Sequence, residues 1–242
     1  MSQPVIAQLK SHRSIRKFTD QPIADSLLHE LIVAGQSAAT SSNLQGVSVI
    51  RINNRQTRQA LAALAGDQAY IEQAPEFLVF CADLYRAGWC CQGAMVEGMT
   101  EHFLIATIDA ALFAQNVVVA AESVGLGICY IGALRNDPWQ VSELLALPEQ
   151  VCPVFGLCLG YPAQDPQCKP RLPLAAVLME DRYQEVDEAQ VAQYDQTMRA
   201  YYQQRTGGRV DRGWSQEMAA LLSKESRPHM REFLARKGLA TR

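Results

Sequence analysis

The stretch LIATIDAALFAQNVVVAAESVGLGICYI, residues 104–131, decides the fold of this 242-residue chain. It belongs to a longer segment, from about residue 94 to residue 124, in which apolar side chains keep a helical spacing and no proline occurs. Gly125-Leu126-Gly127 then ends the helix, and residues 128–131 have the composition of a short buried strand. A long central helix followed directly by a strand predicts a sheet covered by helices.

The flanking sequence predicts further elements of both kinds. Asp25 is expected to cap a helix with an apolar stripe, and Gly66 and Pro138 mark the end of one helix and the start of another. A nearly all-helical C-terminal quarter favours an α+β fold over regular βαβ winding. The expected strands cover residues 47–52, 77–82 and 151–159, and the expected helices cover residues 55–65, 138–147, 188–205, 214–223 and 227–238.

Composition limits the class of protein. With 48% hydrophobic residues, the chain can build one large core, so we expect a single domain over residues 1–242 with a helical tail from about residue 188. A formal net charge of −3 gives no general basic field, which argues against nucleic acid as a partner. Asp109, Gln115 and Asn116 interrupt the most apolar stretch, so it reads as a buried helix and no membrane partner is expected.

The cysteines and histidines predict neither a disulfide framework nor a metal site. There are 7 cysteines, an odd number without paired CxxC motifs, and the 4 histidines share no ligand spacing with them. The N-terminal residues reach several basic side chains before any apolar run of signal-peptide length. We therefore expect a cytoplasmic protein.

Two basic clusters are candidates for one phosphate site. The first is His12-Arg13-Ser14-Ile15-Arg16-Lys17-Phe18, and the second is Lys169-Pro170-Arg171. Guanidinium groups offer paired donors to phosphate oxygens, so the two clusters together suggest a phosphorylated cofactor. The alternative is that both are solvated surface charges.

The remaining motifs are weaker. Gly125 and Gly127 lie between a helix and a following strand, which is the reverse of the order that a dinucleotide-binding fingerprint requires. Gly132 either lets the backbone approach a flat ligand or forms an ordinary turn. Arginines of the tail either bind a 2′-phosphate or keep a helical surface soluble. No motif for nucleotide hydrolysis, zinc proteolysis or serine hydrolysis occurs, so the usual sequence signals for these three reactions are missing.

A series of pieces spread over the whole chain resembles the oxygen-insensitive NADPH nitroreductases of the major, type A group, a family that includes NADPH-flavin oxidoreductases. The pieces are HRSIRKF (12–18), TSSNLQ (40–45), Gln68, AAESVGLGICYIGALRN (120–136), PVFGLCLGYP (153–162), KPRLP (169–173) and KESRP (224–228). The resemblance implies an α+β fold with a mixed or antiparallel sheet, and an intertwined homodimer with one FMN in each of two interfacial sites.

The resemblance also assigns residues to FMN. Ser41 and Gln45 would contact the cofactor from the partner subunit, although the run that begins at Thr40 leaves open which hydroxyl does so. Gln68 would hydrogen-bond the edge of the isoalloxazine ring. The ribityl-phosphate would be held by His12, Arg13, Ser14, Arg16, Lys169 and Arg171, and the ring would lie along Tyr130, Ile131, Gly132 and Ala133.

The activity implied is NADPH-dependent. Arg205 and Arg209 would meet the NADPH phosphate. Hydride would pass from NADPH to FMN and then to a nitroaromatic, nitrofuran or quinone, in a ping-pong cycle that needs no protein nucleophile. Two alternatives stay open: a flavin reductase that supplies free reduced FMN, and a flavin-binding protein without turnover.

Overall fold

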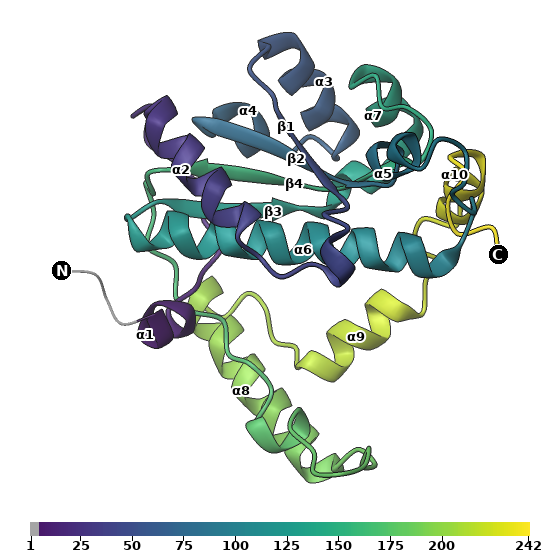
Figure 1. The fold of residues 1–242 in the computed structure, drawn as a ribbon. Helices are drawn as coiled ribbons and strands as arrows, with labels where there is room; N and C mark the ends of the chain where they lie inside the picture. Colours follow the sequence, from purple (N-terminus) through teal and green to yellow (C-terminus); the bar gives the residue numbers. More distant parts are fainter. Residues whose placement is uncertain (1–4) are drawn as a thin grey trace. The chain divides into compact units, whose positions relative to one another are not determined.

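The computed structural model describes residues 5–242 and contains two compact units (Figure 1). The larger unit comprises the chain up to Pro166 together with Arg227–Arg242, and the smaller unit is Gln167–Ser226. The strands are β1 (Val47–Arg51), β2 (Glu76–Asp83), β3 (Gly127–Ile131) and β4 (Val151–Gly160). The α-helices of the larger unit are α1 (Val5–Lys10), α2 (Asp25–Gln36), α3 (Arg55–Leu64), α4 (Tyr70–Gln73), α5 (Tyr85–Cys90), α6 (Thr100–Ser123), α7 (Pro138–Leu144) and α10 (Met230–Arg236).

The four strands form one antiparallel sheet in the order β1-β2-β4-β3. The central strands β2 and β4 are almost continuously apolar and buried, as strands covered on both faces must be. Their register pairs Phe77 with Cys158 and Leu78 with Leu157. Because β3 lies at the edge of the sheet among residues 5–242, its outer side is open to the N-terminal segment.

Each face of the sheet carries its own apolar cluster. Alternate residues of β2 serve the two faces, since successive side chains of a strand point in opposite directions. Leu78 and Phe80 pack with α2 and α6, whereas Phe77 and Val79 pack with α3, α4 and α7. This arrangement of three layers, with α2 and α6 on one face of the sheet and α3 and α7 on the other, is visible in Figure 1.

The smaller unit is mainly helical. It contains α8 (Glu188–Thr206) and α9 (Trp214–Leu222), preceded by a long segment with a single 3₁₀ turn, η3 (Leu174–Ala176). Tyr194, Met198 and Tyr201 of α8 are its buried core, with Trp214 of α9 packed against them. The Asp187 side chain accepts from the backbone of Ala189 and Gln190, and thereby caps α8 at the position where the sequence predicts a helix start.

Several boundaries differ from the sequence-based expectation, among them the helix expected at 227–238, which is α10 (Met230–Arg236), and three of the differences have a local explanation. Asp25 is the first residue of α2 instead of its cap, and its carboxylate accepts a hydrogen bond from Arg51 at 2.8 Å. The central helix begins at Thr100 instead of residue 94, because Gly98 adopts a left-handed φ of +76° that ends the preceding turn. Helix α7 ends at Leu144, before the left-handed Ala146, so it is shorter than expected.

Helix α6 has the length and apolar composition of a membrane span, with a mean hydropathy of 1.8 over its most apolar window. Its buried side chains, among them Phe113, Val117 and Ala121, pack against the sheet and α2. This agrees with the expectation of a core helix. Its outward side chains Leu104, Ile108 and Leu112 are 43–55% exposed at a spacing of four residues, so they form one apolar stripe.

Candidate functional site

The N-terminal basic segment is fixed along the open edge of β3. The Ile15 backbone N–H donates to the Ile128 carbonyl at 2.8 Å, and Phe18 forms an isolated bridge with Pro162. The Ile15 side chain is buried against Gly127, where an added Cβ would lie 2.5 Å from its Cγ1. This close approach explains why glycine stands at the start of β3, and it anchors the basic residues on both sides of Ile15.

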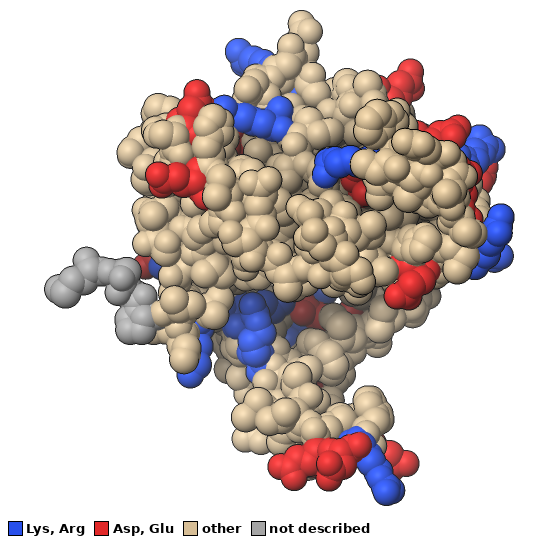
Figure 2. All heavy atoms as spheres, in the orientation of Figure 1, with Lys and Arg blue, Asp and Glu red and all other residues tan. Residues whose placement is uncertain are grey.

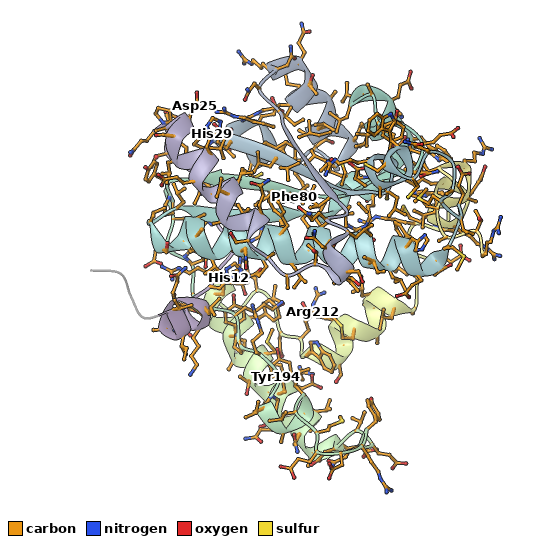
Figure 3. All side chains as sticks on the ribbon, viewed as in Figure 1. His12, Asp25, His29, Phe80, Tyr194 and Arg212 are labelled. Atoms are coloured by element: carbon orange, nitrogen blue, oxygen red, sulfur yellow. The ribbon has the colours of Figure 1, made fainter. Side chains whose placement is uncertain are left out.

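Two of those basic residues lie against carboxylates. His12 Nδ1 lies 2.6 Å from Glu122 Oε1, near the C-terminal end of α6 (Figure 3). Arg13 Nη2 lies 2.5 Å from Asp165 Oδ1, and its Nη1 donates to the Ser11 carbonyl. Within residues 5–242, Arg13 Nε is buried without a hydrogen-bond partner. Arg13 also lines a pocket of about 390 Å³ with Gln8, Ser11, Ile15, Glu122, Ser123, Gly125, Leu126, Gly127, Pro162 and Gln164.

Arg16 lies elsewhere, beside Tyr70 and Cys129. Burial raises the pKa of the Tyr70 hydroxyl and of the Cys129 thiol. The positive charge of Arg16 lowers both pKa values and so offsets part of this effect. The Tyr70 hydroxyl donates to Gln68 Oε1 at 2.6 Å. The structure therefore links two of the predicted site residues, Arg16 and Gln68, through a tyrosine that sequence reasoning did not single out.

The loop that carries Ser41 and Gln45 is held by a buried carboxylate. Asp109 of α6, which is 1% exposed, accepts from the Ser41 backbone N–H at 3.3 Å and from the Gly46 backbone N–H at 3.0 Å. Between these anchors Ser42, Asn43 and Gln45 have φ values of +50°, +57° and +54°. Left-handed backbone at non-glycine residues is typical of functional loops, and the exposed Ser41 and Gln45 side chains remain available for contacts.

The end of β3 carries the other ring-contact candidates. Tyr130 is 36% exposed, stacks edge-on against Phe155 at 5.1 Å, and has a pKa that burial raises to about 12. Ile131 is buried, and Gly132 begins the 3₁₀ turn η2 (Gly132–Asn136) with Ala133 next to it.

Two arginines frame that turn. An added Cβ at Gly132 would lie 3.3 Å from Arg135 Nη2, and Arg135 donates to the Val154 carbonyl. Arg227, from the KESRP piece, donates twice to Asn136 Oδ1, at 2.9 and 3.0 Å. This contact brings Arg227 against the turn that follows β3.

The remaining candidates lie in the smaller unit. Lys169 Nζ is 5.4 Å from the centre of the Tyr202 ring, and Arg171 donates to the Lys169 carbonyl at 2.9 Å. Arg205 donates to the Tyr201 hydroxyl at 2.9 Å, and Arg209 Nε donates to the Thr206 carbonyl. Lys169 therefore lies beside α8, Arg205 lies within α8, and Arg209 follows its end. Their convergence with the N-terminal cluster stays a prediction.

The described residues contain no group of three or more potential metal ligands. Burial raises the pKa of the Cys81, Cys152 and Cys158 thiols, which disfavours the thiolate needed for nucleophilic attack. What the larger unit offers instead is a set of hydrogen-bond donors near the edge strand β3. Such a set suits the binding of an anionic, planar molecule that brings its own chemistry.

Comparison with known proteins decides the family. The model named "Nitroreductase family" matches residues 9–161, and "Nitroreductase family, C-terminal domain" matches residues 169–242. This chain belongs to the nitroreductase family. The identification confirms both the family resemblance and the expected α+β fold.

Similar nitroreductase-family proteins match over the full length. The NADPH-flavin oxidoreductase of Vibrio harveyi is 48% identical over 98% of both chains. The oxygen-insensitive NADPH nitroreductase of Salmonella typhimurium is 46% identical over 99% of both chains. A solved structure of the NADPH:FMN oxidoreductase from Vibrio harveyi, complexed with NAD+, is 47% identical with a TM-score of 0.92, covering 98% of this chain and 99% of that chain.

Sequence reasoning did not single out two residues that contact the candidate site residues of this nitroreductase-family chain. Tyr70 stands two positions after Gln68, a spacing that gives no signal until the turn before α4 brings the side chains together. In the sequence, Asp109 interrupts an apolar helix, and no functional role was assigned to it. A buried carboxylate requires hydrogen-bond donors, so its place on the apolar face could have indicated a structural role.

Proposed function

We propose that this chain is an NADPH-dependent oxidoreductase that holds FMN and reduces nitroaromatics, nitrofurans and quinones. The observation that carries the proposal is the cluster of Arg16, Tyr70 and Gln68 beside β3. It occurs in a chain whose full-length relatives are named NADPH-flavin oxidoreductase and NADPH nitroreductase.

The donors present fit FMN. Arg13 has a buried Nε without a partner within residues 5–242, and Gln68 Nε2 has no acceptor in the same part of the chain. The cofactor's phosphate and ring edge would supply acceptors for such groups. His12, Ser14, Arg16, Lys169 and Arg171 complete the proposed phosphate cradle, and residues 130–133 the proposed ring contacts.

When bound, FMN supplies the acceptor and donor of an electron pair, and the protein binds and orients the reactants. Gln68 presents a fixed donor, which stabilises negative charge at the ring without reorganisation. The exposed Tyr130 and the small Gly132 and Ala133 leave room for flat molecules to approach. A flat open site discriminates weakly between aromatic oxidants, which supports a broad substrate class.

Homodimer formation completes the proposal. The apolar stripe Leu104, Ile108 and Leu112 on α6 is a surface that a monomer leaves in water. In the view of Figure 2 the surface over α6 is largely uncharged, as the centre of an interface is. The loop with Ser41 is hydrogen-bonded to Asp109 of the same helix. Pairing of two subunits over α6 would therefore bring Ser41 and Gln45 close to the partner's FMN.

We further propose that residues 1–242 act as one functional domain in the cytoplasm, with the smaller unit supplying the NADPH contacts. Arg205 lies in the last turn of α8, and Gly207 and Gly208 follow with φ values of +61° and +82°. These glycines let the chain turn sharply so that Arg209 can follow Arg205 at the helix end. Two guanidinium groups at that place suit a 2′-phosphate.

Steady-state kinetics test this function against its alternatives. We expect NADPH to be strongly preferred over NADH as the reductant, and quinone reduction to be much faster than FMN dissociation. If FMN leaves faster than the quinone is reduced, the protein is a supplier of free reduced FMN. If the FMN-loaded protein is not reduced by either nucleotide, it is a binding protein without turnover.

A further inference from the structure

Three polar side chains from separate segments meet beside β3. Arg16 comes from the N-terminal extended segment, Gln68 from the turn after α3, and Tyr70 from the first turn of α4. The Tyr70 hydroxyl lies 2.6 Å from Gln68 Oε1, and the Arg16 guanidinium lies beside the same hydroxyl. The hydroxyl therefore stands between a permanent cation and an amide.

The chemistry of these groups fixes the direction of the hydrogen bonds. A guanidinium has only donors, so Arg16 offers no acceptor for the Tyr70 proton. The single proton of the hydroxyl is then donated to the Gln68 carbonyl oxygen. With Oε1 engaged in this way, the amide cannot rotate without losing the bond, and Nε2 is the Gln68 atom left for a ligand. Within residues 5–242, Nε2 donates to no protein acceptor.

We propose that Tyr70 is a positioning residue that locks the Gln68 amide as a donor toward the acceptor atoms of the flavin ring edge. This inference rests on the proposed function. An unlocked glutamine could present either its oxygen or its nitrogen, and the ring edge carries both carbonyl acceptors and one N–H donor. Locking selects the acceptors, on which negative charge increases when the ring is reduced. Tyr70 thereby favours the reduced cofactor.

Burial supports this role. Tyr70 is half-buried in the cluster beneath β3, and burial raises the pKa of its hydroxyl despite the nearby Arg16. The hydroxyl stays protonated at neutral pH and is a constant donor. Its ring packs with the core, so replacement by phenylalanine removes the hydrogen bond to Gln68 and keeps most of the packing.

The test is an anaerobic redox titration of the FMN-loaded protein and its variants. In Tyr70→Phe we expect the affinity for reduced FMN, relative to oxidised FMN, to fall about 3- to 10-fold, the usual effect of one lost hydrogen bond, with a more negative midpoint potential. Tyr161→Phe is the matched control, because Tyr161 is half-buried in the same unit and its hydroxyl makes no hydrogen bond among the described residues. Its midpoint should equal that of the wild type.

A double-mutant cycle shows whether Tyr70 acts through Gln68. In Gln68→Leu the midpoint should also fall, and adding Tyr70→Phe should cause no further change. A wild-type midpoint in Tyr70→Phe overturns the proposal, as does an undiminished effect of Tyr70→Phe in the Gln68→Leu background. If the wild-type chain takes up no FMN at all, the proposed function fails and this inference fails with it.

Discussion

The Asp109 carboxylate, buried in the middle of α6, accepts a hydrogen bond from the Gly46 backbone N–H at 3.0 Å. Its second oxygen accepts from the Ser41 N–H, so one side chain holds both ends of the loop that precedes β1. The contact is close on the backbone side as well, because a Cβ added at Gly46 would lie 2.9 Å from the Ala106 Cα. The position of the loop thus depends on a residue far away in the sequence.

Asp109→Asn should destabilise the protein by about 1–3 kcal/mol, because an amide offers one acceptor in place of two and leaves a backbone N–H unpaired. Thermal unfolding measures this change. FMN retention should fall as well, since Ser41 and Gln45 lose their anchor. Glu101→Gln, an exposed change on the same helix, is the control and should leave both quantities unchanged. An equal melting temperature for Asp109→Asn and the wild type would contradict the anchoring role.

Arg16→Ala should weaken FMN binding by about 10-fold or more, the usual effect of losing charge-assisted hydrogen bonds. The fraction of protein purified with flavin, and titration of the apoprotein with FMN, measure the effect. Lys17→Ala removes an adjacent exposed charge that has no role in the proposed site, and it should bind FMN as the wild type does. Equal FMN affinity in both variants would remove Arg16 from the cofactor site.

Ile108→Glu should convert a dimer to a monomer, because it places an unpaired carboxylate in the centre of the apolar stripe on α6. A buried unpaired charge costs about 3 kcal/mol or more, so the dimer dissociation constant should rise at least about 100-fold. Light scattering over a range of concentrations measures this. Leu144→Glu changes a comparably exposed leucine on α7 and should stay dimeric. A dimer that survives Ile108→Glu places the interface elsewhere.

Tyr130 should make stability fall at alkaline pH. Burial raises its pKa from 10.0 to about 12 in the folded chain, so above pH 10 the unfolded state releases a proton that the folded state keeps. The contribution of Tyr130 to the free energy of unfolding is fully present below pH 10 and is lost as the pH rises toward 12. Urea unfolding at several values above about pH 9 should show a smaller loss in Tyr130→Phe than in the wild type. Parallel pH profiles would show that Tyr130 titrates normally.

The strands and the C-terminal helices could be predicted from sequence because their signals are local. Apolar runs define β2 and β4, and an acidic cap residue marks the start of α8. The start of α6 could not be predicted in this way, because the apolar pattern continues through Gly98, whose left-handed backbone separates α6 from the short helix before it. At Gly98 the apolar pattern predicts a continuous helix, whereas the backbone conformation ends it, and the backbone conformation determines where α6 begins.

The candidate site, too, could be predicted from the sequence only in part. His12, Arg13 and Arg16 are conspicuous in the sequence, yet the structure gives them different surroundings: Glu122, Asp165 and Tyr70, respectively. These partners come from distant parts of the chain, so no spacing rule reveals them. Residue types therefore indicated the kind of ligand, whereas the individual contacts required the fold.

The most direct test of the account is an anaerobic visible spectrum of the FMN-loaded protein, recorded before and after NADPH and again after a nitrofuran. We predict flavin bands that bleach with NADPH and recover with the nitrofuran, since electrons pass through the bound cofactor in two separate steps. Bands that stay oxidised after NADPH, or a protein that remains colourless after incubation with FMN, would contradict the proposed function.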